Sequence, residues 1–275
     1  MTSLVLAALI ALGFIDQQVT DVLTRERLEP MLAEESPRLI EATFARHPDA
    51  VLPFIDSYFE GGLAMIEEGK PEEDARASFR RGLAFAEIAA KAFDDDSIAQ
   101  YAANFASWSP QEQKIFREGQ KQFGAGRSAL KDEKLDDARV CFTASRRAAS
   151  RLGDLWGEAM ALEGLASTEL KAGRPMDANA AGRRSADLYQ RLRMYTTEAR
   201  VHLLCAEATM SGPSKRAALS SLGRAWGIVG PQPPSEFRTK VRDIYLAAMD
   251  REGMVVEAAE IRREEGLVPP ESDED

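Results

Sequence analysis

The feature of this sequence that most restricts its fold is the return of small side chains at intervals of 40 residues. Small side chains are needed wherever two helix backbones approach closely. A unit of this size cannot bury its apolar face alone, so stacked copies share one continuous core. The spacing therefore predicts a row of similar helical units. Three series keep the interval: Ala138, Ala178, Ala218 and Ala258; Gly126, Ala166 and Ala206; and Ser145, Ser185 and Ala225.

The local composition predicts helices throughout. Good helix formers dominate, and the alternating β-branched stretches that indicate strands are missing. Ser36-Pro37 marks one helix start, because a capping serine precedes a first-turn proline. Ser109-Pro110 marks another, where Glu112 can complete a capping box. These signals predict an all-α chain.

Turn-forming residues recur with the alanines. They stand five positions earlier, at Gly173, Pro213 and Gly253. In the first unit this position is Glu133, so we expect that turn to depart from the others. The segments between turns are about 13 to 20 residues long, which suits antiparallel helices joined by short connections.

This register resembles the tetratricopeptide repeat (TPR), a helix–turn–helix unit. The first unit supplies the family's small, alanine, aromatic and small positions as Gly126, Ala138, Phe142 and Ser145, whereas Gly182 replaces the aromatic in the second. The standard unit has about 34 residues, so this chain is similar to the long-helix variants of bacterial signalling and regulatory proteins. The resemblance implies a right-handed α-α superhelix, a TPR-like solenoid of antiparallel helix pairs whose first helices line a concave face.

The register also suggests a division of the chain. We expect residues 1–50 to form an extra N-terminal helical segment that could cap the fold. Residues 51–108 should form an acidic helix pair, which is a divergent repeat, and a connector, and residues 94–113 interrupt the 40-residue period. Residues 109–266 should form four TPR-like helix pairs, and residues 267–275 an acidic disordered tail.

Charge separates the two halves of the chain. Of 35 basic and 45 acidic side chains, residues 1–100 carry 9 and 19, and residues 101–275 carry 26 of each. A net charge of −10 argues against a nucleic-acid partner, because phosphates would be repelled. The acidic front half is expected either to cap the stack or to occupy its groove as a self-inhibitor.

An apolar run, Leu4–Ile15, begins the chain. Twelve residues are too few to cross a bilayer, which needs roughly 20, so no membrane span is expected. The run could be a buried helix closing one end of the fold, a secretory signal, or a helix that contacts a membrane or another copy. We expect a cytoplasmic protein, or an exported one if residues 1–15 act as a signal.

Reactive residues are scarce. The chain has two histidines, His47 and His202, and two cysteines, Cys141 and Cys205. This nearly excludes multi-histidine metal sites, and a nucleophilic cysteine has no histidine beside it in sequence. We expect no metal, no cofactor and no catalytic residues, and hence not an enzyme.

Two short motifs have a structural interpretation. Gly124–Ala129 matches a dinucleotide-binding pattern, but helical sequence precedes it where a strand is required, so its glycines are read as packing positions. Asp94–Asp96 lacks the spaced ligands of a calcium loop and is read as a solvated helix end with capping residues.

The TPR resemblance places the first helices on the concave surface, with apolar, methionine and charged side chains suited to a bound peptide or helix. It does not imply the chaperone-tail clamp, because Phe123 and Arg127 stand where lysine and asparagine would be needed. We therefore expect a non-catalytic scaffold or adaptor that binds a protein or peptide. The alternative is a ligand- or peptide-sensing regulatory module acting with a protease or transcription factor. The candidate groove residues are Phe123, Arg127, Leu130, Met160, Glu163, Leu170, Arg200, Leu203, Glu207, Met210, Arg242 and Tyr245.

Overall fold

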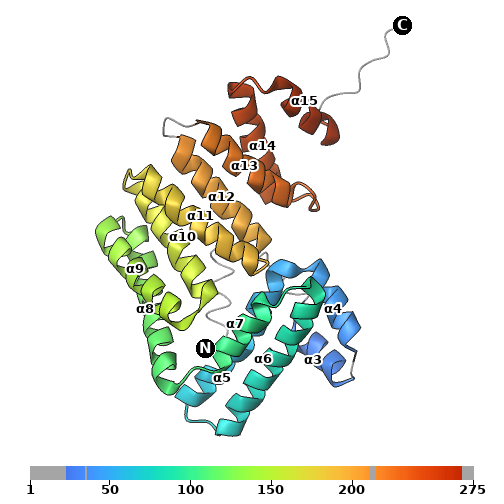
Figure 1. The fold of residues 1–275 in the computed structure, drawn as a ribbon, viewed down its shortest axis with the longest axis vertical. Helices are drawn as coiled ribbons and strands as arrows, with labels where there is room; N and C mark the ends of the chain where they lie inside the picture. Colours follow the sequence, from blue (N-terminus) through green and yellow to red (C-terminus); the bar gives the residue numbers. More distant parts are fainter. Residues whose placement is uncertain (1–22, 35, 211–214, 268–275) are drawn as a thin grey trace.

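The computed structural model describes residues 23–34, 36–210 and 215–267, and within them it contains 13 helices and no strand. The all-α prediction is confirmed for this part of the chain. Figure 1 shows the helices following one another in a curved row. They are α3 (Arg25–Ala33), α4 (Pro37–Arg46), α5 (Pro48–Glu67), α6 (Glu72–Phe93), α7 (Ser97–Ala106), α8 (Pro110–Lys131), α9 (Leu135–Leu152), α10 (Leu155–Lys171), α11 (Pro175–Arg191), α12 (Tyr195–Met210), α13 (Lys215–Val229), α14 (Glu236–Arg251) and α15 (Val255–Glu264).

The predicted helix starts are confirmed. Helix α4 begins at Pro37, directly after Ser36. At the start of α8, the Glu112 amide donates to Ser109 Oγ at 3.4 Å, and the Glu112 carboxylate accepts from the Ser109 amide at 2.7 Å. This reciprocal pair is the capping box, and it satisfies amides that the first helical turn leaves without partners.

The turn at Glu133 corrects a sequence expectation. Glu133 takes the left-handed conformation, with φ 59°, as Gly173 and Gly253 do with 72° and 75°. The side chain differs from glycine, but the backbone makes the same kind of turn. A second left-handed series, which the sequence did not reveal, joins Gly153 (φ 65°) to Arg193 (φ 58°) at the same interval. The repeat is therefore more regular in its backbone than in its residues.

The small residues lie where neighbouring helices meet, as predicted. All four alanines of the first series are at most 3% exposed. A Cβ atom added to Gly126 would lie 2.9 Å from the Phe142 ring, and one added to Gly182 would lie 2.6 Å from Cys205 Sγ. Real Cβ atoms essentially never approach so closely, so these glycines are set by packing.

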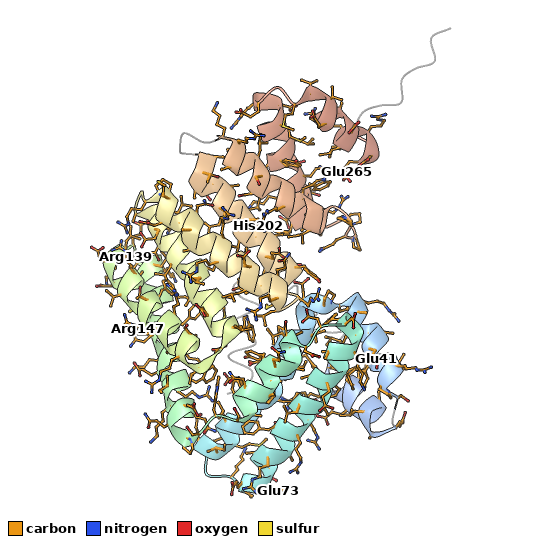
Figure 2. All side chains as sticks on the ribbon, in the orientation of Figure 1. Glu41, Glu73, Arg139, Arg147, His202 and Glu265 are labelled. Carbon is orange, nitrogen blue, oxygen red and sulfur yellow. The ribbon has the colours of Figure 1, made fainter. Side chains whose placement is uncertain are left out.

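Helices α8 to α15 pack as four successive antiparallel pairs, and each pair packs on the next. The first helices α8, α10 and α12 also contact one another, which makes them the inner row of the stack (Figure 1). This sequential packing is consistent with a solenoid. The second helices lie outside: Arg147 of α9 is exposed on the outer side of the stack in Figure 2.

The N-terminal unit, α3 to α7, shares one continuous apolar core with buried residues of α8 to α12. Its centre is a group of packed aromatic rings, including Phe54 and Phe85 with centroids 4.9 Å apart and Phe59 and Phe105 at 5.0 Å. Helix α7 occupies the expected connector, and position 50 lies inside α5 rather than at an element boundary. The Leu4–Ile15 run and residues 268–275 lie outside the described residues.

Helix α5 bridges two parts of the inner row. Toward its C-terminal end, Glu60 and Glu67 bind Arg117 of α8, each at 2.6 Å. At its first turn, the Asp49 carboxylate accepts from the amide and hydroxyl of Thr196 in α12, at 2.8 and 3.1 Å. Helix α5 therefore runs along the inner side of the stack from α8 to α12.

Candidate functional site

A cavity of about 340 Å³ lies between α5 and the inner side of the first two helix pairs. Its volume is within the range of pockets that hold small molecules or short peptide groups. One face of α8 forms much of the wall, because Phe116, Gln120, Phe123 and Arg127 recur at helical spacing. The full wall comprises Asp56, Glu60, Tyr101, Phe116, Gly119, Gln120, Phe123, Gly124, Arg127, Ser145, Ala148, Ala149, Leu152, Asp154, Trp156, Gly157 and Met160.

One end of the cavity is acidic. Asp56 and Glu60 reach it from α5, and Asp154 from the turn before α10. All three residues are less than one-tenth exposed. The Tyr101 hydroxyl of α7 donates to Asp56 Oδ1 at 2.7 Å, and Asp154 Oδ1 accepts from the Gly157 amide at 2.8 Å as the N-cap of α10.

The cationic side chain nearest to this end is already paired. Arg117 binds Glu60 and Glu67, and Gln120 adds a hydrogen bond to Glu60. In the described ranges, no ion pair forms at Asp56 or Asp154. Two buried carboxyl groups are therefore held by neutral donors alone.

The surroundings change the proton affinity of both carboxyl groups. Burial raises the pKa of Asp154 to about 6, and the charge of Glu60 adds to the rise, although the Gly157 and Trp156 amides oppose it. Burial raises the pKa of Asp56 well above its ordinary value, with Glu60 and Asp154 adding to the effect. A carboxylate without a counter-ion is disfavoured in such a site, so its charged form would gain from an added cation.

The remaining walls are mostly apolar. Phe116, Leu152, Trp156 and Met160 present hydrocarbon and ring surface. Phe123 packs on Phe142 with ring centroids 5.7 Å apart, which fixes the plane of its ring in the wall. Arg127 lies two turns beyond Gln120 along α8, roughly 10 Å away at the rise of an α-helix. The cavity wall thus combines an acidic group, apolar and aromatic surface, and Arg127 at a distance from the acidic group.

Three of the predicted groove residues, Phe123, Arg127 and Met160, line this cavity. Two others lie in helix contacts. Leu130 packs with the Ala129 cluster between α8 and α9, and Leu203 packs between α12 and its neighbours.

Other predicted residues are engaged in contacts within the stack. Glu163 binds Arg200 at 2.9 Å and accepts from the Tyr189 hydroxyl at 2.9 Å. Arg242 binds Asp243 at 2.8 Å and lies 3.5 Å from Glu265. These charged side chains pair within the stack and do not line an open groove.

The last four predicted residues share no site. Tyr245 lies against Gly223 of α13, and Leu170 is half-buried near the end of α10. Glu207 and Met210 are exposed near the C-terminal end of α12, far along the stack from the cavity. Of the twelve candidates, only Phe123, Arg127 and Met160 line one cavity.

Sequence reasoning missed the acidic end and Trp156. Asp56 and Glu60 had one available signal: they are carboxylates one helical turn apart in the strongly apolar stretch Val51–Leu63. Buried acidic residues in an apolar helix commonly mark a site. Asp154 directly follows Gly153, at a turn between helices, and Tyr101 lies in the expected connector.

The other residues with chemical potential have structural surroundings. His202 is buried in the stack 3.6 Å from Glu198 (Figure 2). Cys205 is also buried, and burial raises the pKa of its thiol to about 11, so it stays protonated at neutral pH. Cys141 of α9 is partly buried. Asp95 accepts from the Ser97 amide at 2.8 Å and pairs with Arg193 at 3.0 Å, whereas Asp96, the N-cap of α7, makes no side-chain capping hydrogen bond.

Other expected features can be placed as well. Gly124–Ala129 lies inside α8, and the described residues contain no strand that could precede it. Among those residues, no cluster of three His, Cys, Asp or Glu side chains could hold a metal ion. None of the described helices is both long and apolar enough to cross a bilayer.

Comparison of the sequence with protein-family models finds no match. A search of curated protein sequences finds no significant relative either.

Proposed function

We propose that this protein is a non-catalytic binding protein, a right-handed TPR-like solenoid that takes a short segment of a partner protein into the cavity beneath α5. The observation that carries the proposal is the cavity itself, with its apolar walls and few polar groups at fixed positions. Such sites bind ligands through buried apolar area and obtain specificity from the polar groups. The free thiols of Cys141 and Cys205 accord with a cytoplasmic location.

The contacts along the stack favour a compact site over a long open groove. The charged candidates Glu163, Arg200 and Arg242 are paired within the stack, and α5 covers the inner side of the first two pairs. A bound segment would therefore place one or two side chains inside rather than lie along all four pairs.

A sensing role is the second candidate, and the bridge made by α5 favours it. Asp49 holds one end of α5 to α12, and Glu60 holds the other part to α8. A ligand bound between α5 and α10 would contact α5 between these two attachments and could change its position. A ligand that binds one arrangement of α5 better than another would shift the equilibrium between the two arrangements. A protease or transcription factor that binds only one arrangement would respond to that shift.

A cavity-filling pair of variants tests the proposal. A Cβ atom added to Gly124, which lines the cavity, would meet open space, and one added to Gly227 of α13, away from the cavity, would do the same. Gly124→Leu should fill the cavity, and Gly227→Leu provides the matched control, because both replace a helical glycine. The full chain is panned against a displayed library of random peptides. We expect enriched peptides that bind the Gly227 variant and lose binding to the Gly124 variant.

Two results would count against the proposal. One is a library that yields no enriched peptide with the full chain. The other is a set of enriched peptides that bind both variants equally, because their site would then lie outside the cavity.

A further inference from the structure

We infer that the cavity recognises a basic side chain, lysine or arginine, of the bound segment, with the cation at Asp56 and Asp154 and the hydrocarbon stem along the aromatic wall. This inference rests on the proposed function and adds the chemistry of the ligand. It is carried by the cavity together with the charge imbalance among the buried groups that line it.

The acidic end has more negative than positive groups. Asp56, Glu60 and Asp154 all line it, and Arg117 is shared between Glu60 and the more exposed Glu67. Asp56 is 8% and Asp154 4% exposed, and neither carboxylate forms an ion pair within the described residues. A buried carboxylate without a cation is unfavourable, and a cation brought in by a ligand would offset that cost.

The apolar wall of the cavity suits the stem of a basic side chain. Phe116 and Trp156 provide ring surface next to the acidic end, and Leu152 and Met160 provide aliphatic surface. Lysine and arginine bury long hydrocarbon stems and place their charge beyond them. A cation near ring faces gains a further attraction that is strongest for tryptophan. An uncharged apolar side chain would use the walls but leave the acidic end unmatched.

The charges that face the acidic end come from every neighbouring element. Glu60 of α5 and Tyr101 of α7 lie beside Asp56. Arg117 of α8 pairs with Glu60 and partly offsets the negative charge of Asp56 and Glu60. Glu158 of α10 adds negative charge near Asp154. Arg146 of α9 lies 3.6 Å from the Glu158 carboxylate and partly offsets that charge. Arg127 stands at a distance from the acidic group and would repel a cation there. The cation is thus directed to the acidic group.

The experiment uses peptides in which a central residue X is flanked by three degenerate positions on each side. Fluorescein-labelled pools with X as arginine, lysine, citrulline or norleucine are titrated with the full chain by fluorescence polarisation. We expect the arginine and lysine pools to bind at least about tenfold more tightly than the other two, as expected for a desolvated charge pair. Agmatine, a free guanidinium ligand, is titrated in parallel by calorimetry.

Variants locate the effect. Asp56→Asn with Asp154→Asn should abolish the preference for the cationic pools, whereas Asp187→Asn, on the exposed surface of α11, should retain it. Thermal unfolding of each variant shows whether it is folded. If the double variant does not fold, the Asp154→Asn single variant replaces it, with a reduced preference expected.

The outcomes separate this inference from the proposed function. If all four pools bind equally, the cavity does not recognise a basic side chain, but the proposal that it binds a peptide is retained. Binding of agmatine without any peptide overturns peptide binding and leaves the cation site standing. No binding by peptides or agmatine overturns both, and an unchanged cationic preference in the folded double variant overturns the assignment to Asp56 and Asp154.

Discussion

The N-terminal unit and the repeat stack differ in how much aromatic surface lies between their helices. In α3 to α7, large rings such as Phe54, Phe59 and Phe85 pack against neighbouring rings, and many acidic side chains cover the outside. A close approach occurs there too, because a Cβ atom added to Gly62 would overlap the Phe79 ring. In α8 to α13, backbones approach through alanine, glycine and serine, as at Gly126 and Gly182. The cavity lies where these two regions meet, and its acidic end comes partly from the acidic unit. A ligand site thus arises at the junction of two regions that do not pack identically.

The largest expected effect tests the aromatic unit. Phe85→Ala removes a fully buried ring that contacts Phe44, Phe54 and Tyr58. We expect a loss of roughly 3–5 kcal/mol in unfolding free energy, the usual cost of such a cavity. Chemical denaturation with urea measures it. A loss below about 1 kcal/mol would mean that the rings do not hold this unit together.

The next effect tests the close approach in the stack. Gly126→Leu would force a side chain into the Phe142 ring, where even a Cβ atom would lie at 2.9 Å. We expect a destabilisation of about 2–3 kcal/mol from overpacking. Gly227→Leu, with open space around it, should be neutral or slightly stabilising. Equal urea midpoints for these two variants would contradict the nesting of helices at Gly126.

A third prediction concerns the acidic end of the cavity. The pKa of Asp154 is raised from 3.8 to about 6 in the folded protein, so the fold binds this proton more tightly than the unfolded chain. The resulting stability is complete below pH 3.8 and is lost as the pH rises through 6. Asp154→Asn keeps a capping residue and removes the charge. We expect it to stabilise the free protein by roughly 1–3 kcal/mol at about pH 7.5 and by much less at about pH 4.5.

Urea unfolding at the two pH values measures this difference, with Asp187→Asn as the control on an exposed surface. A stabilisation that is the same at both pH values would show that the charge of Asp154 is not the cause. A gain in stability with a loss of cationic peptide binding would show that the site is maintained at the expense of the stability of the free fold.

The smallest effect compares two equivalent turns. Glu133 takes a left-handed conformation that costs a non-glycine residue about 1 kcal/mol. We expect Glu133→Gly to stabilise by about 0.5 kcal/mol and Gly173→Ala, at the matching turn, to destabilise by about 1 kcal/mol. Thermal melts measure both. A destabilising Glu133→Gly together with a stabilising Gly173→Ala would contradict the shared backbone conformation.

The helical units were predictable because their causes are local. The Ser109–Glu112 capping box and the alanines from Ala138 to Ala258 lie within or next to the contacts that they make. The inner wall at Phe123, Arg127 and Met160 followed from the same register. Asp56, Tyr101 and Asp154 did not, because they meet across separations of 45 residues and more, and no periodic pattern joins them.

By itself the sequence determined that this chain forms helix pairs and where those pairs touch, because small side chains, caps and turns act over a few residues or across one turn. The course of α5 along the inner row was decided only in three dimensions, by contacts such as Asp49 to Thr196, which lie 147 residues apart. The cavity and its unpaired carboxyl groups depend on that course, since they exist only once α5 lies opposite α8 and α10.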